Sequence, residues 1–238
     1  MHLENIVIDA ADPAVLGGFW AAALGLEVLS DEPEALEARL QVGECWLDLC
    51  FPRVGDACPS RAPRLHLDLA AGEEQRATVE RLLGLGAQHL DIGQGDVSWT
   101  VLGDVAGNAF CVLEPRPQLP ATGPLTALPL DSADPERDAS FWQLASGWVP
   151  VEGKAPRTLQ HPSGDGPLLE LCPELGPAHG HEPMHLDVRP AEDEDGQECL
   201  ARLLDAGATR VEHPWGPLPW TVLADPSGNE LCLLGVAS

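Results

Sequence analysis

Apolar and polar residues alternate along the chain with two different periods, which predict short strands and helices. Over residues 13–24 the apolar side chains recur every three or four positions. Asp12-Pro13 before this run is typical of a helix start, and Gly25 after it is typical of a helix end. Short apolar runs of strand type lie at 3–10, 27–30, 38–42 and 44–51. The predicted order of this first unit is therefore βαβββ.

The rest of the chain repeats this order three more times. A second unit has a strand at 64–70, a helix at 73–85 and strands near 88–91, 99–103 and 109–114. Further helices are expected at 135–145 and 192–206, with strands near 125–131, 148–151, 158–161, 168–172, 184–189, 210–212, 220–224 and 230–235. Four βαβββ units of similar length thus compose the protein.

The second pair of units repeats the first pair. The stretch from Trp99 to Leu113 recurs almost letter for letter from Trp220 to Leu234, and each copy contains an Asp-x-x-Gly-Asn turn between two strands. Phe19-Trp20 likewise recurs as Phe141-Trp142. We therefore predict two domains, at 1–115 and 124–238, joined by a proline-rich linker at 116–123.

Composition narrows the possible partners. The chain has 38 acidic and 13 basic residues and a formal net charge of −25, which argues against nucleic acid and against an anionic membrane as partner. No apolar stretch approaches the length of a membrane span, and the first residues lack a secretory signal. Seven cysteines without a C-x-x-C pair favour free thiols in a reducing compartment. The expectation is a cytoplasmic, bacterial protein.

Titratable residues recur at equivalent positions of the two halves. His66 and His185 each lie within an apolar strand, and Asp48 and Glu170 each alternate with apolar neighbours. Each histidine is either a core residue hydrogen-bonded to Asp48 or Glu170, or a contact for a metal or substrate. Each carboxylate faces either a pocket or solvent.

The cysteines and tryptophans of the repeated stretch each allow a structural and a functional interpretation. Cys111 and Cys232, in the last strand of each half, are either small buried hydrophobes or thiolate ligands. Trp99 and Trp220 either pack the sheet or form the aromatic wall of a pocket suited to a planar or cationic ligand.

The paired βαβββ units, the Phe-Trp on the first helix and the closing Asp-Pro-Ser-Gly-Asn-Glu-Leu-Cys hairpin at 225–232 resemble one family. This is the glyoxalase/bleomycin-resistance/extradiol-dioxygenase superfamily, also called the vicinal oxygen chelate superfamily. The resemblance implies an α+β fold, a tandem pair of glyoxalase-like domains. Each half would form a curved eight-stranded mixed sheet around a pocket, with the helices outside.

The resemblance also implies a divalent metal, held in the pocket by one residue from each of four strands, which polarises oxygen atoms of the substrate. Carried over strand by strand, these positions are Asn5, Asp48, His66 and Cys111 in the first half, and Ala127, Glu170, His185 and Cys232 in the second. The chain departs from the family pattern, because alanine offers no ligand and cysteine replaces the last glutamate. The remaining metal candidates are Asp48 with His66 and Glu170 with His185.

A thiolate ligand would favour zinc, although manganese, nickel, iron or no metal at all stay open. Asn5, Trp99, Cys111, Trp220 and Cys232 are expected to line the pockets. The first functional reading is metal-assisted lyase, isomerase or dioxygenase chemistry on a small oxygenated substrate, with at least one half non-catalytic. The alternative is a metal-free protein of the bleomycin-resistance type that binds a cationic, aromatic antibiotic or metabolite. Both a monomer with internal pairing and a homodimer fit the repeat.

Overall fold

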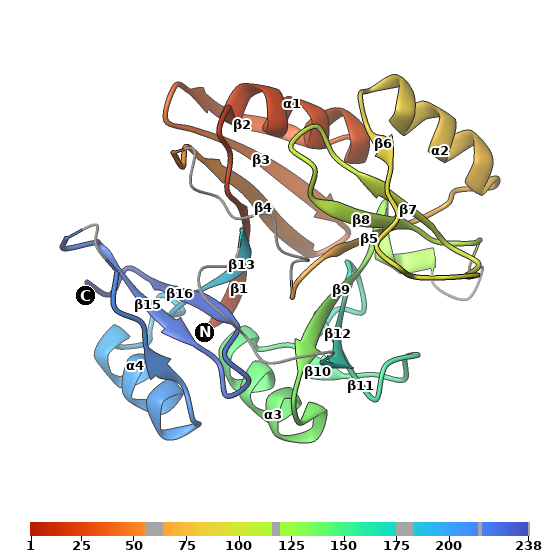
Figure 1. Ribbon diagram of the computed structural model, residues 1–238. Coiled ribbons are helices and arrows are strands. Elements are labelled where there is room, and N and C mark those ends of the chain that lie inside the picture. Colours follow the sequence, from red (N-terminus) through yellow and green to blue (C-terminus); the bar gives the residue numbers. More distant parts are fainter. Residues whose placement is uncertain (56–63, 116–119, 175–182, 214–215, 238) are drawn as a thin grey trace.

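The computed structural model describes residues 1–55, 64–115, 120–174, 183–213 and 216–237 (Figure 1). The first half contains β1 (His2–Ile8), α1 (Pro13–Leu24), β2 (Glu27–Glu32), β3 (Ala35–Val42), β4 (Cys45–Pro52), β5 (Leu67–Leu69), α2 (Gln75–Gly84), β6 (Gln88–His89), β7 (Thr100–Gly103) and β8 (Ala109–Val112). This order confirms two consecutive βαβββ units.

The second half repeats the order. After a short 3₁₀ turn, η1 (Pro120–Thr122), it contains β9 (Leu125–Ser132), α3 (Pro135–Ser146), β10 (Val149–Pro150), β11 (Arg157–Gln160), β12 (Leu168–Pro173), β13 (Met184–Arg189), α4 (Gly196–Asp205), β14 (Thr209–Arg210), β15 (Trp220–Ala224) and β16 (Glu230–Leu234). Part of the expected linker, residues 116–119, lies outside the described residues.

Two eight-stranded mixed sheets confirm the α+β class, and neither sheet closes into a barrel. One, here called the outer-unit sheet, has the order β14-β15-β16-β13-β1-β4-β3-β2 and so combines the first and fourth units. The other, the inner-unit sheet, has the order β10-β11-β12-β9-β5-β8-β7-β6 and combines the second and third units. The four helices lie on the outer sides of the two sheets (Figure 1).

The pairing of the units corrects one expectation, because neither half forms a sheet of its own. β1 pairs antiparallel with β13, from His2 opposite Arg189 to Ile8 opposite Met184. β5 pairs antiparallel with β9 in the same way, with Asp68 opposite Ala127. The periodicity of a strand determines its buried face but not its neighbour, and the His-Leu-Asp sequences of β5 and β13 are alike. The sequence therefore could not distinguish a partner in the same half from one in the other half.

The two motifs that mark the repeat contact each other. Trp20 of α1 is fully buried, and its indole Nε1 donates a hydrogen bond to Asp104 Oδ2 at 3.1 Å. Asp104 begins the Asp-x-x-Gly-Asn turn between β7 and β8, where its Oδ1 accepts from the backbone N–H of Asn108 at 3.0 Å. The second half repeats the contact between Trp142 Nε1 and Asp225 Oδ2 at 3.0 Å. Each contact joins the two sheets, since each half contributes one unit to each sheet.

Helix ends follow the local sequence closely. Asp12 caps α1 by accepting from the Val15 N–H, and Gly25 ends the helix with a φ of 69° in the left-handed region. α4 begins later than expected, at Gly196, because the Asp195 side chain caps it and Glu194 instead accepts from the Ala191 N–H in the preceding turn. Among the described residues, no helix is long and apolar enough to cross a membrane.

The Trp142–Asp225 contact predicts a stability effect. Trp142→Phe removes the indole donor and leaves the buried Asp225 carboxylate with one hydrogen bond fewer, which should lower the free energy of unfolding by about 1–3 kcal/mol. Trp99→Phe is the matched control, because Trp99 is 38 % exposed and should change stability by less than about 0.5 kcal/mol. Urea denaturation measures both. Equal stability of the two variants would contradict the structural role of the contact.

The pairing across halves predicts how a separate half behaves. Residues 1–115 alone would leave β1 and β5 without the partners that β13 and β9 provide. Because β5 and β13 are equivalent strands, two copies of this fragment can pair β1 with β5 reciprocally. We expect a folded dimer and no folded monomer in light scattering combined with circular dichroism. A folded monomeric fragment would show that the predicted boundary at 115 separates independent domains.

Candidate metal centre and pocket

A pocket of about 860 Å³ lies on the outer-unit sheet. It is on the sheet face turned away from α1, since Leu36 of β3 packs toward Gly17 of α1 while the adjacent Glu37 lines the pocket. Strands β1, β3 and β4 of the first half and β13, β15 and β16 of the second half all contribute to it. The pocket is therefore built by both halves, and its size suits a small molecule.

Three candidate ligands of different chemistry converge on this pocket. His185 and Asp187 are two residues apart on β13, so both point to the pocket face. Cys232 lies directly opposite Asp187 on the neighbouring strand β16. The His185 Nε2 atom is 3.3 Å from Asp187 Oδ1 and 3.5 Å from Cys232 Sγ. An imidazole, a carboxylate and a thiol thus meet at one point.

Asn5 on β1 completes the cluster. It lies opposite Asp187 in the sheet, and its Nδ2 donates to Asp187 Oδ2 at 3.0 Å. This bond fixes the orientation of the amide, because the reversed amide would place oxygen against the carboxylate. Asn5 Oδ1 and His185 Nδ1 are buried and have no hydrogen-bond partner. Buried polar atoms normally have partners, so Asn5 Oδ1 indicates that a bound group belongs here, whereas His185 Nδ1 is directed away from the side of the ring that meets Asp187 and Cys232.

The spacing suits a tetrahedral metal site. Zinc–ligand distances of about 2.0–2.3 Å at the tetrahedral angle place neighbouring ligand atoms about 3.3–3.8 Å apart. The two distances from His185 Nε2 agree with this spacing. His185, Asp187 and Cys232 could therefore hold an ion without large movement, and a fourth position would stay open toward the pocket. The donor set fits a divalent metal.

Charge interactions within the cluster raise one histidine pKa. Burial alone would lower the pKa of His185, but hydrogen bonds to Asp187 and Cys232 outweigh this effect and raise the pKa well above its ordinary value. Burial raises the pKa of the Cys232 thiol, although the contact with His185 works in the opposite direction. Without a metal, the cluster therefore holds a proton on the imidazole at neutral pH.

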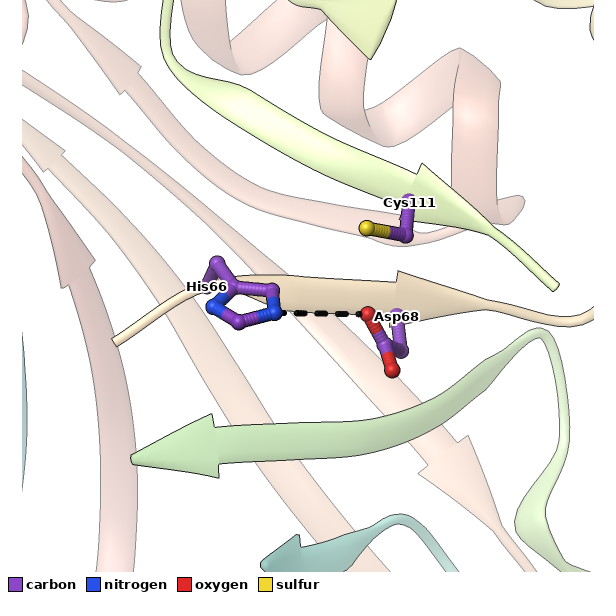
Figure 2. Close-up of side chains that lie close together, drawn as sticks. All are labelled: His66, Asp68 and Cys111. Atoms are coloured by element: carbon purple, nitrogen blue, oxygen red, sulfur yellow. Dashed lines mark ion pairs between the residues drawn. The ribbon is translucent and has the colours of Figure 1, made fainter. Parts of the chain in front are cut away.

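The inner-unit sheet carries an equivalent cluster of His66, Asp68 and Cys111 (Figure 2). His66 Nε2 is 3.6 Å from Asp68 Oδ1, and Figure 2 shows the Cys111 side chain on the adjacent strand β8. Desolvation lowers the pKa of His66 to about 4, although 33 % of its side chain is exposed and solvent access weakens this penalty. Ala127 stands opposite Asp68, where the outer-unit sheet has Asn5. The outer-unit cluster therefore has a polar side chain opposite its aspartate, whereas the inner-unit cluster has an apolar one.

The structure regroups the metal candidates predicted from the sequence. Because the sheets form across the halves, Asp48 shares a sheet with His185 and Glu170 shares a sheet with His66. The expected pairs, Asp48 with His66 and Glu170 with His185, are therefore not brought together. The four strand positions become Asn5, Asp48, His185 and Cys232 in one sheet, and Ala127, Glu170, His66 and Cys111 in the other.

Asp48 has a different partner from the one the sequence suggested. Arg39 on β3 binds both of its carboxylate oxygens, at 2.7 Å each, and also stacks on Trp46 at 4.3 Å from the ring centroid. Asp48 is therefore neutralised and is not among the residues that line the pocket. Glu170 is buried in the inner-unit sheet.

The two tryptophans that were expected to line pockets lie in different surroundings. Trp220 lines the large pocket, whereas Trp99 is partly exposed beside a separate depression of about 480 Å³.

The candidates predicted from the sequence did not include Asp68 and Asp187, which lie two positions after the predicted histidines. The signal for them was the repeated His-Leu-Asp triplet, since residues i and i+2 of a strand share a face.

The two histidines should titrate in opposite directions. In protein kept metal-free by a chelator, NMR should find His185 protonated at neutral pH and His66 neutral until about pH 4. Because the folded-state pKa of His66 lies below its unfolded value, its contribution to stability falls as the pH drops from about 6.5 toward 4. His66→Asn should therefore lose less stability than the wild type between about pH 7 and about pH 5. An identical loss in both proteins would contradict the lowered pKa.

Comparison with known proteins agrees with this architecture. Crystal structures of two variants of glyoxalase I from Zea mays match 98 % of this chain and 91 % and 92 % of their own chains, with TM-scores of 0.63 and 0.61 and identities of 17 % and 16 %. A glyoxalase-related enzyme from Fulvimarina pelagi is 20 % identical, with a TM-score of 0.40 over 53 % of this chain and 97 % of its own. No curated protein matches the chain in sequence. The sequence profile of the glyoxalase-like domain matches residues 5–113 and again 127–234, so the chain belongs to the glyoxalase-like domain family.

Proposed function

We propose that the chain is a divalent-metal-dependent protein that acts on a small oxygenated substrate in the pocket of the outer-unit sheet. The observation that carries this proposal is the convergence of an imidazole, a carboxylate and a thiol: the ligand atoms of His185, Asp187 and Cys232 lie within 4.8 Å of one another, and both distances from His185 Nε2 suit a tetrahedral site. The buried, unpartnered Asn5 Oδ1 beside them supports a bound group at this place. These residues replace the expected ligand sets that contained Asp48 and Glu170.

The ligand types favour zinc among the metals that the family resemblance implies, because thiolate and imidazole together are typical of zinc. A bound zinc ion supplies Lewis-acid polarisation of substrate oxygens but no redox chemistry. This favours an isomerase or lyase reaction over a dioxygenase reaction.

The residues of the chain have separate tasks in this proposal. Asn5 fixes Asp187 through its amide nitrogen, so the carboxylate keeps one oxygen directed at His185. Trp220, Val222 and Leu234 form apolar walls that exclude water from the bound substrate. The two halves cooperate, since Asn5 comes from the first half and the three ligands come from the second.

A metal-free binding protein of the bleomycin-resistance type is the second candidate function. It is favoured by the contacts of the cluster itself, in which His185 Nε2 already has a hydrogen-bond contact with Cys232 Sγ and an ion pair with Asp187 without an ion between them. A second contact also favours it. Arg39 donates to both carboxylate oxygens of Asp48, which stands at a strand position where metal-using relatives are expected to have a ligand, so this carboxylate is not available to an ion. The pocket would then bind an antibiotic or metabolite directly.

We also propose that the protein works as a monomer in a bacterial cytoplasm. Both sheets are completed within one chain, so the pairing that a homodimer would provide is already internal. The cysteines of the described residues with an assigned state are free thiols, which suits a reducing compartment: Cys45, Cys50, Cys111, Cys172, Cys199 and Cys232.

The metal proposal predicts a specific loss of zinc. Wild-type protein dialysed against zinc should retain one tightly bound ion in the outer-unit sheet, measured by elemental analysis and by competition with a chromophoric chelator. Loss of a residue that only hydrogen-bonds to a metal ligand weakens metal binding by up to about 100-fold. Loss of a direct ligand should therefore weaken zinc binding by more than about 100-fold. His185→Ala should therefore lose this ion, whereas His89→Ala, at an exposed histidine of β6, should keep it.

His66→Ala serves as the matched test of the inner-unit cluster. If that cluster also binds zinc, the wild type contains a second ion that only this variant loses. Retention of all zinc by His185→Ala, or no zinc in the wild type under any loading condition, would overturn the metal proposal. The second result would instead favour the metal-free candidate.

A further inference from the structure

One wall of the large pocket is acidic. Glu37 of β3 lines the pocket directly opposite Cys50 of β4, and the Cys50 thiol donates a long hydrogen bond to Glu37 Oε1 at 3.7 Å. Among the described residues, the nearby arginines pair with other carboxylates: Arg39 binds Asp48 and Arg189 binds Glu4, although the charge of Glu37 also helps to raise the pKa of Arg39. A carboxylate therefore faces the pocket without a paired cation.

Other carboxylates surround the same thiol. Burial raises the pKa of Cys50, and the charges of Glu37, Asp187 and Asp48 raise it further. The thiol is thus neutral at physiological pH. Of the three carboxylates around it, Asp48 is neutralised by the bidentate contact with Arg39. Asp187 is paired with His185 and accepts from Asn5, so Glu37 remains as the negative group on this side of the pocket.

Hydrogen-bond acceptors dominate this part of the pocket. Asn5, which is 8 % exposed and lines the pocket, has a carbonyl oxygen without a donor. The arginines that line the pocket are already engaged, since Arg189 binds Glu4 and Arg53 donates to the carbonyl oxygens of Ala11 and Pro33. A ligand group that complements Glu37 and Asn5 must donate hydrogen bonds and carry positive charge. An ammonium group does both, because it has three donors and no acceptor.

We propose that the ligand of this pocket carries a protonated amine, which sits over Cys50 and is recognised by Glu37. Its apolar part extends across Val7 of β1 toward His185, and Val222 and Trp220 of β15 line the pocket beyond His185. Two strand spacings of about 4.8 Å separate β4 from β13, so the amine over Cys50 and the group at His185 lie roughly 10 Å apart along the sheet. The inference shares its pocket with the proposed function but does not require a metal. Glu37 is then a specificity-determining residue.

The test compares two probes that differ in charge and hardly in shape. Phenethylammonium and phenethyl alcohol are titrated into metal-free protein by calorimetry. The wild type should bind the ammonium about tenfold more tightly, as expected for one charge-assisted hydrogen bond. Glu37→Gln should reduce this preference to about twofold or less. Glu32→Gln is the matched control, because it removes one negative charge from exposed strand β2 outside the pocket and should keep the full preference.

Either of two results would overturn the inference: equal binding of both probes by the wild type, or equal loss of preference in Glu32→Gln and Glu37→Gln. The second would mean that the net charge of the chain, and not Glu37, attracts the amine. The zinc content of Glu37→Gln is measured in parallel and should equal that of the wild type. Zinc binding without an ammonium preference overturns this inference alone, whereas an ammonium preference without zinc overturns only the metal proposal.

Discussion

The backbone hydrogen bonds between β1 and β13 are the interaction on which the pocket depends. They join the first strand of the chain to the first strand of its last unit, and they place Asn5 opposite Asp187. Cys232 then follows from the pairing of β13 with β16, and Glu37 follows from the order β1, β4, β3. A shift of β13 relative to β1 by one residue would turn Asp187, and with it Cys232 on the adjacent β16, to the helix side of the sheet, away from Asn5 and Glu37.

The second constraint is the hydrogen bond between the buried indole of each Phe-Trp pair and the aspartate of each closing turn. Trp20 binds Asp104 and Trp142 binds Asp225, and each bond joins a helix on one sheet to a hairpin of the other sheet. Backbone pairing thus holds the halves together, while these two contacts hold the sheets together. The motifs that reveal the repeat in the sequence are conspicuous because a buried donor and a buried carboxylate need each other.

The two sheets share one plan but present different chemistry. Arg39 faces Asp48 in the outer-unit sheet, whereas Thr158 faces Glu170 at the equivalent position of the inner-unit sheet. Asn5 likewise corresponds to Ala127. These exchanges alter charge and hydrogen bonding within the same strand plan. The pKa values of the two histidines shift in opposite directions, because contacts with Asp187 and Cys232 outweigh burial at His185, whereas burial alone lowers the pKa of His66.

The sequence by itself determined the local structure and the family. Periodicity, caps and turns predicted the four βαβββ units and the helix at 13–24 to the residue, because these signals act between neighbours in the chain. The repeated His-Leu-Asp triplet even contained the site residues Asp68 and Asp187. Only the tertiary structure decided which units share a sheet, since equivalent strands offer the same edge to either partner. The predicted pairs of Asp48 with His66 and of Glu170 with His185 therefore failed, although the individual histidines lie in the clusters.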